Sequence, residues 1–223
     1  MLLTSGLLVA ATVSTWAIDK AELDKRIRLL TTKLQNMQEK GDKRIPAETL
    51  KKAQGIVLLD RTKAGFIFAY AGGSGVGMVK TRSGNWSAPA FYKANEASLG
   101  FQIGGQQSFM VILLMNTNAT KMLTETKVDF GGEASGTAGD ASAEAEGRLP
   151  NEAQIQVYDD RIGLYGGAAI KGGGIVVDEN ANLAYYDQAV SPRDILFGGK
   201  VKTSDAAAEL MKAINSAAKS SGK

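Results

Sequence analysis

Glycine is concentrated in the stretch that most limits how this chain can fold, residues 63–92. Aromatic and β-branched residues surround the cluster Gly-Gly-Ser-Gly-Val-Gly at 72–77, and a polar break, Arg-Ser-Gly-Asn, follows at 82–85. Aromatic and β-branched side chains favour strands, and a polar break that contains glycine and asparagine favours a tight turn. The stretch therefore predicts a strand, a glycine-rich crossing, a second strand, a turn and a third strand.

The glycine content of the whole chain agrees with this interpretation. The 223 residues include 26 glycines, well above the usual share of about 7%, and the glycines follow no collagen-like period. Apolar residues make up 44% of the chain and charged residues 22%, which is ordinary for a folded protein. A chain of this length fits one domain, and we expect its glycines in turns and in closely packed strands.

The chain contains no cysteine and no histidine. The thiol nucleophile, the imidazole base and the usual zinc or iron ligand sets are therefore excluded. The glycine cluster at 72–77 lacks the spacing of phosphate-binding loops and leads into a predicted strand, so close strand packing explains it better. We assign no catalytic residue, no metal ligand and no cofactor, and we expect that the protein is not an enzyme.

The first 17 residues predict a targeting segment. They are uncharged and mostly apolar, and Thr15-Trp16-Ala17 ends them with small residues at the two positions that a signal peptidase reads. The alternative, an uncleaved anchor, is disfavoured because the stretch is short for the roughly 20 residues of a membrane span. We therefore expect a cleaved signal peptide and an exported protein, periplasmic or extracellular, with peripheral membrane contact.

Two helices are expected after this segment. Asp19 and Glu22 resemble a capping box, and proline followed by glycine predicts a short second helix between Pro46 and Gly55. The apolar residues of the first helix recur at steps of four and three: Leu23, Ile27, Leu30, Leu34 and Met37. We expect this stripe to dock on the β core, which is the usual role of such a face.

The remaining chain predicts a β core closed by a helix. Strands are expected at 56–59, 98–107, 110–115, 128–135, 155–158, 163–170, 174–177 and 183–186. The run 110–115 is apolar without alternation, which predicts a strand buried on both faces. Short helices are expected behind Asn116 and Ser191, a hairpin turn at the Asx-rich 178–182, and a C-terminal helix at 204–218.

These elements define the expected organisation. The fold class is α+β: a mainly antiparallel, strongly bent, glycine-rich sheet or partial barrel flanked by N- and C-terminal helices. The expected divisions are a signal peptide at 1–17, a helical segment at 18–54, a β core at 55–203, and a helix and tail at 204–223.

Charge is unevenly distributed along the chain, although the net charge is only +3. Basic residues outnumber acidic ones between 20 and 63, and the reverse holds between 125 and 160. A basic helical end suits a membrane surface or a nucleic acid, whereas a solvated helix face with internal ion pairs would look similar. The candidate lipid-binding residues are Lys25, Arg26, Arg28, Lys33, Lys43, Arg44, Lys51 and Lys52.

Several ordered motifs resemble the signature of the SYLF family, a lipid-associated domain. They are Ala-Gly-Phe at 64–66, the glycine cluster at 72–77, Gly-Asn-Trp-Ser-Ala-Pro-Ala at 84–90, Gly-Phe-Gln-Ile-Gly-Gly-Gln at 100–106, Asp-Phe-Gly-Gly at 129–132, Gly-Leu-Tyr-Gly-Gly at 163–167 and Tyr-Tyr-Asp at 185–187. The resemblance covers residues 45–200. It implies ordered strands in the small-residue region 131–147, where composition alone would predict a flexible linker.

The resemblance implies binding to acidic phospholipids or phosphoinositides and no nucleic-acid partner. Phosphoinositide specificity does not carry over, because the predicted signal peptide partly occupies the position of the basic amphipathic segment of eukaryotic relatives. We therefore expect a non-catalytic module that contacts anionic phospholipid. The alternative is a structural or protein-interaction module of the envelope; some fungal relatives bind actin.

Cleavage of the signal peptide is directly testable. Mass analysis of exported protein is expected to show a mature N-terminus at or near Ile18, because Ala17 follows the pattern of a signal-peptidase site. An intact Met1 on exported protein would contradict this prediction and favour an uncleaved anchor.

Overall fold

The computed structural model describes residues 18–60, 73–94, 108–130, 154–160, 163–165 and 174–219. The helices are α1 (Lys20–Glu39), α2 (Ala47–Lys52), α3 (Thr117–Met122), α4 (Glu179–Tyr186), α5 (Pro192–Leu196) and α6 (Asp205–Lys219). The strands are β1 (Gly55–Asp60), β2 (Ser74–Val79), β3 (Ala90–Ala94), β4 (Phe109–Leu114), β5 (Lys127–Asp129), β6 (Ile155–Asp159), β7 (Gly163–Tyr165) and β8 (Gly174–Val177).

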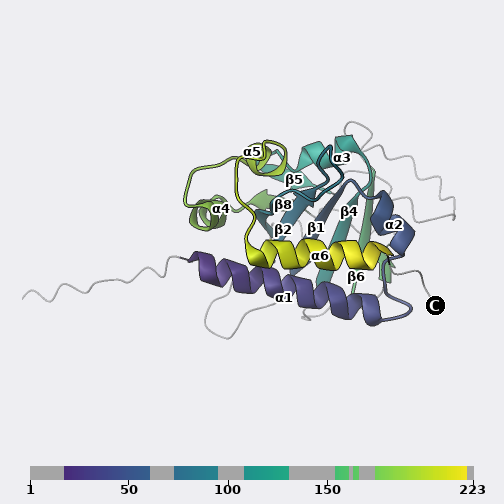
Figure 1. Ribbon diagram of the computed structural model, residues 1–223. Helices are drawn as coiled ribbons and strands as arrows, with labels where there is room; N and C mark the ends of the chain where they lie inside the picture. Colours follow the sequence, from purple (N-terminus) through teal and green to yellow (C-terminus); the bar gives the residue numbers. More distant parts are fainter. Residues whose placement is uncertain are drawn as a thin grey trace, which may run out of the picture.

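One curled sheet contains all eight of these strands, in the order β5-β8-β3-β2-β1-β4-β6-β7. Each neighbouring pair in this order is antiparallel. Helices from the N- and C-terminal parts of the chain cover the sheet (Figure 1). The predicted α+β class, a bent antiparallel sheet flanked by N- and C-terminal helices, is thus confirmed.

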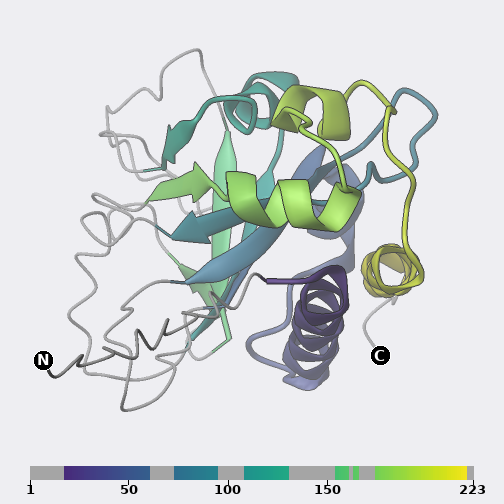
Figure 2. The same cartoon turned by 90° about the vertical axis from the view of Figure 1, so that its left-hand side faces the viewer.

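The sheet is a middle layer with a hydrophobic core on each face (Figure 2). Alternate residues of one strand enter opposite cores because successive strand side chains point to opposite faces. In β4, Val111 and Leu113 pack with α1 and α6, whereas Met110 and Ile112 pack on the side of α3 and α5. This arrangement confirms the predicted burial on both faces for residues 110–114 and explains why the run lacks alternation, whereas Met115 follows the strand and is half-buried.

The apolar stripe of α1 lies entirely inside the first core. All five stripe residues have no exposed surface, and burial of each leucine-sized side chain stabilises the fold by about 1.5–3 kcal/mol. Asp19 begins the helix by accepting a hydrogen bond from the Glu22 backbone N–H at 2.8 Å. Docking of the stripe on the β core is confirmed, so these residues cannot insert into a bilayer while α1 is in place.

One prediction of local structure is wrong. The segment 178–186 forms α4 rather than an Asx hairpin turn and a strand, because Asp178 caps the helix by accepting from the Ala181 backbone N–H at 3.1 Å. The buried Asn182 side chain then bonds both backbone groups of Phe91, accepting from its N–H at 2.9 Å and donating to its carbonyl at 3.2 Å. A contact between distant segments therefore decides the structure here.

Other predictions fall outside the described residues. They are the signal peptide at 1–17, the first strand of the glycine-rich stretch, the strand at 98–107, the small-residue segment 131–147, and the later parts of the strands expected at 128–135 and 163–170. The helices expected behind Asn116 and Ser191 and the C-terminal helix are confirmed as α3, α5 and α6.

The glycine-rich crossing brings two backbones together. Gly75 of β2 pairs with Leu59 of β1, and a Cβ atom at Gly75 would lie far inside the van der Waals contact distance from the Leu58 carbonyl oxygen. A Cβ at Gly77 would instead meet the Tyr92 ring at 2.9 Å, which is a contact with a side chain and not with backbone. The cluster at 72–77 therefore serves close strand packing at Gly75, as the sequence predicts.

Substitution of Gly75 by alanine is expected to destabilise the protein by at least the 1–3 kcal/mol typical of overpacking, because the clash is with backbone. Gly77→Ala should cost less. Gly41→Ala is the matched control, since no atom lies within 4 Å of the added Cβ. Chemical denaturation of the three variants measures the order, and equal stability of Gly75→Ala and Gly41→Ala would contradict it.

Candidate functional site

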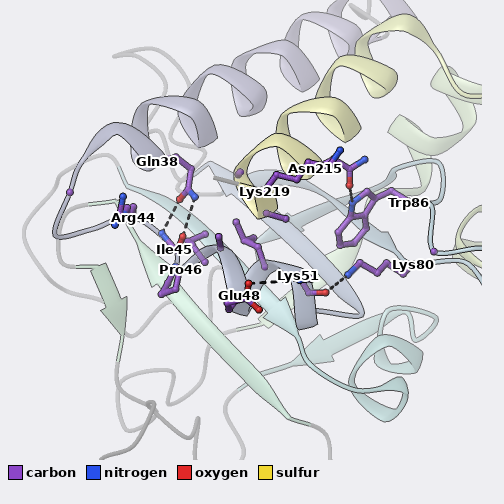
Figure 3. Close-up of a pocket in the computed structure, with 16 residues that line it drawn as sticks. Gln38, Arg44, Ile45, Pro46, Glu48, Lys51, Lys80, Trp86, Asn215 and Lys219 are labelled. Atoms are coloured by element: carbon purple, nitrogen blue, oxygen red, sulfur yellow. Dashed lines mark hydrogen bonds and ion pairs between the residues drawn. The ribbon is translucent and has the colours of Figure 1, made fainter. Parts of the chain in front are cut away.

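A groove lies where the α1–α2 loop, α2, the β2–β3 turn and the last turn of α6 meet (Figure 3). Its volume is about 870 Å³, which falls in the range of about 300–1,000 Å³ typical of small-molecule sites. Small residues of the lining leave this space open: Gly41, Ala47, Gly84, Ala217 and Ala218.

The β2–β3 turn places Lys80 directly opposite Trp86. The Thr81 backbone N–H donates to the Asn85 carbonyl at 2.7 Å, and Gly84 takes a φ of 81°, which glycine adopts without strain. The Lys80 Nζ consequently lies 5.4 Å from the centroid of the Trp86 ring, within the distance of a cation–π contact. The turn thus presents an ammonium and an aromatic ring on one wall of the groove.

Lys80 also ties this wall to α2. Its Nζ donates to the Lys51 backbone carbonyl at 2.7 Å, and burial lowers the pKa of the Lys80 ammonium below its usual value. Charge interactions strengthen as the surroundings become less aqueous. Lys80 is half-buried, whereas Arg44, Lys51 and Lys219 are exposed, so its ammonium is the cation of the groove most shielded from water.

The last turn of α6 forms the opposite wall. α6 runs parallel to α1 and beside it (Figure 1), with Arg28 against Glu209 at one end of the pair and Gln38 near Ala217 at the other. The Asn215 Oδ1 atom accepts a hydrogen bond from the Trp86 indole N–H at 3.1 Å. This bond fixes the end of α6 against the β2–β3 turn and brings Lys219 to the groove.

The α1–α2 loop forms the third side of the groove, and a side-chain amide holds it in place. Gln38 accepts from the Ile45 backbone N–H at 2.8 Å and donates to the Ile45 carbonyl at 3.1 Å. The neighbouring Arg44 is exposed and lines the groove on the side away from Lys80 (Figure 3). Local hydrogen bonds thus position the basic residues from several elements around one cavity.

The groove is strongly basic. Among the described residues that line it, the cations are Arg44, Lys51, Lys80 and Lys219, and the one carboxylate is Glu48. Glu48 lies 3.8 Å from the Lys51 ammonium in an exposed pair, which contributes little to stability. A neighbouring hollow of about 680 Å³ between α1 and α6 has balanced charge, with Arg28 and Lys212 against Glu39 and Glu209.

The structure divides the eight basic residues that the sequence singles out. Arg44 and Lys51 line the groove. Lys25 is exposed on α1, 3.5 Å from Glu22, and Arg28 reaches Glu209 of α6 at 3.3 Å. Arg26 and Lys43 are half-buried, and Lys52 is exposed at the end of α2. These side chains do not gather on one face of α1.

Lys33 has a different environment from the other seven. Its Nζ lies 2.7 Å from Oδ1 of Asp60 at the end of β1, and the Asp60 side chain is only 9% exposed. Lys40 similarly lies 3.8 Å from Asp160, which follows β6. These pairs join α1 to the ends of two strands, so Lys33 contributes to the packing of the helix on the sheet.

A second polar cluster joins three helices. The Tyr185 hydroxyl of α4 donates to Asp24 of α1 at 2.8 Å and contacts the Ser204 hydroxyl, which itself donates to Asp24 at 3.0 Å. Burial raises the pKa of Tyr185, so its phenol stays protonated. The three groups satisfy one another, and the cluster acts as a brace between helices.

Among the described residues, no three acidic side chains come together in a way that could hold a metal ion. None of the helices in the described ranges combines the length and apolar character needed to cross a membrane.

The family model described as Ysc84, Las17-binding protein actin regulator, matches residues 95–217, more than half of the chain. The chain therefore belongs to the SYLF, or Ysc84, family, which confirms the resemblance seen in the sequence motifs. Most residues that line the groove precede the matched segment.

Curated relatives are similar over most of this chain. The human SH3 domain-containing YSC84-like protein 1 is 31% identical over 183 residues, 80% of this chain and 54% of that protein. Protein YSC84 of Saccharomyces cerevisiae is 30% identical over 205 residues, 89% of this chain and 44% of its own length. LAS seventeen-binding protein 3 of the same yeast is 29% identical over the same shares. The chain thus spans about half the length of the curated relatives it matches. One of the three names, LAS seventeen-binding protein 3, states a binding role for that protein.

Replacement of Lys33 by methionine is expected to destabilise the protein by about 3 kcal/mol, because it removes the ammonium that contacts the buried Asp60 carboxylate. The control Lys25→Met, which alters an exposed pair, should cost about 0.5 kcal/mol or less. Urea denaturation of both variants measures the difference. Equal losses would mean that the Lys33–Asp60 pair is dispensable for the fold.

Proposed function

We propose that the protein is a non-catalytic lipid-binding module of the cell envelope that attaches peripherally to anionic phospholipid through the basic groove. The observation that carries this proposal is the charge of the groove, where four cations face one carboxylate. Membership of a family that is described as Las17-binding, with a yeast relative named for the same binding, supports a binding role. The proposal includes export of the chain, which rests on the apolar sequence of residues 1–17.

The electrostatics of the groove support attachment by charge. Each basic side chain close to an anionic membrane surface contributes about 1 kcal/mol, so several acting together give measurable binding. The apolar stripe of α1 is fully buried, so it is not available to insert into a bilayer. Attachment should therefore weaken as added salt shortens the Debye length.

The proposed contact with phospholipid relies on Arg44 and Lys51, which line the groove, more than on Lys25, Arg26, Arg28 and Lys33, which do not. Arg28 and Lys33 already contact carboxylates of the domain, and charge reversal at Lys33 would disturb the fold as well as any surface. Lys80 and Lys219 join Arg44 and Lys51 as the proposed contact residues. Lys43 and Lys52 lie near these residues in sequence and remain candidates for the edge of the contact.

A protein partner is the second candidate. The family is described as Las17-binding, and relatives in yeast carry names that state this binding. An acidic segment of a partner would suit the same groove by charge. A structural or interaction role in the envelope therefore becomes the favoured function if vesicles are not bound.

The test is co-sedimentation with phosphatidylglycerol vesicles against phosphatidylcholine vesicles. The variant Arg44→Gln/Lys219→Gln should lose about 2 kcal/mol of binding to phosphatidylglycerol, roughly 30-fold, because two exposed cations are removed. Lys121→Gln/Lys202→Gln is the matched control, since both lysines are exposed and lie outside the groove lining.

The wild type and the control should bind phosphatidylglycerol preferentially and release it at high salt. Equal sedimentation with both vesicle types, or an unaffected Arg44→Gln/Lys219→Gln variant, would overturn attachment through the groove.

A further inference from the structure

The walls of the groove are more apolar than a contact with a flat charged surface requires. The accessible apolar part of the lining comes from Pro46, which is exposed, and from Ala47, Ala217 and Ala218, which are half-buried. Trp86, Ile45 and Leu50 also line the groove but are almost fully buried. A site that bound only phosphate groups would need the cations alone. This combination of basic rim and apolar wall has the chemistry of an amphiphile's binding site.

We propose that the groove takes one anionic amphiphile, a monoacyl phospholipid, whose phosphate lies among the cations and whose first chain carbons lie against the apolar walls. This inference rests on the proposed attachment to anionic phospholipid and names the lipid class that the groove itself would hold. The volume of about 870 Å³ is that of a site for one small molecule.

Charge placement favours an anionic headgroup over a zwitterionic one. Lys80 and Lys51 come from one side of the groove, Lys219 from α6 and Arg44 from the α1–α2 loop, so cations surround the cavity (Figure 3). The cation–π contact and the Lys51 carbonyl hold the Lys80 ammonium in place. Such a fixed cation loses little side-chain freedom when a phosphate binds.

Trp86 provides a direct readout of binding. The sequence contains two tryptophans, Trp16 and Trp86. Trp16 lies in the predicted signal peptide, so the mature protein carries a single indole, in the groove wall, and Trp16→Phe gives the same single indole in a chain that keeps the segment. A ligand that approaches Lys80 changes the charge beside this indole, because the ammonium lies over the ring. Fluorescence of the Trp16→Phe protein therefore reports occupancy of the groove.

The probe is lysophosphatidylglycerol, titrated below the concentration at which it forms micelles. Lysophosphatidylcholine with the same chain tests the headgroup charge, and glycerol 3-phosphate tests the need for the chain. Saturable binding is expected for lysophosphatidylglycerol, with at least tenfold weaker binding of the other two. Equal binding of lysophosphatidylcholine, or equal binding of glycerol 3-phosphate, overturns the proposal.

Groove-filling variants separate this inference from vesicle attachment. Ala218→Phe keeps the net charge but fills the groove from α6, and Ala47→Phe does so from α2. Each variant that retains the wild-type melting temperature should lose lysophosphatidylglycerol binding at least tenfold and still sediment with phosphatidylglycerol vesicles. Arg44→Gln/Lys219→Gln should weaken both.

The outcomes distinguish the two proposals. If both filled variants bind lysophosphatidylglycerol like the wild type, the groove is not the amphiphile site, although vesicle attachment can still hold. If the wild type binds neither vesicles nor lysophosphatidylglycerol, both proposals fail. If the filled variants lose vesicle binding as well as lysophosphatidylglycerol binding, attachment to vesicles requires a lipid inside the groove. Charge attraction alone then does not explain attachment.

Discussion

The close approach of β1 and β2 at Gly75 is the constraint on which the rest of the structure depends. With no side chain at Gly75, the backbone of β2 can lie against Leu58 and Leu59. This fixes the register that sends alternate residues of β1 into two separate cores, and a shift of one residue would exchange the faces. Both helical layers therefore depend on one position without a Cβ atom.

Local sequence signals predicted most of the described fold, whereas long-range contacts decided the parts that were missed. Asp19, Asn116 and Ser191 each cap a helix through a bond to a backbone N–H three residues ahead, which a sequence pattern can show. α4 was missed because Leu-Ala-Tyr-Tyr at 183–186 has strand-like residues, although Asp178 gives the same local capping signal. The bonds of Asn182 to Phe91 add a long-range contact. Nothing near Asn182 in the sequence indicates that partner.

The candidate site shows the same division. Arg44 and Lys51 were predicted from the basic composition of their segment, but composition could not separate them from Lys33, whose partner Asp60 lies 27 positions away. Lys80 was missed, although a signal existed: Lys80 and Trp86 lie close to the two ends of the predicted turn at 82–85, and the structure pairs them across the hairpin. Lys219 could not be predicted, because its place depends on the docking of α6 in the first core and on the bond between Asn215 and Trp86.

The bond between Trp86 and Asn215 also bears on the stage of folding at which the groove can form. The groove is assembled from residues 38–51, from the β2–β3 turn and from 215–219, so it does not exist until the last helix has been synthesised and has docked. A ligand held there binds the completed domain alone and, by mass action, stabilises it against undocking of α6. A ligand in the groove would thus bind only those molecules in which residues 38–51 and 215–219 have come together.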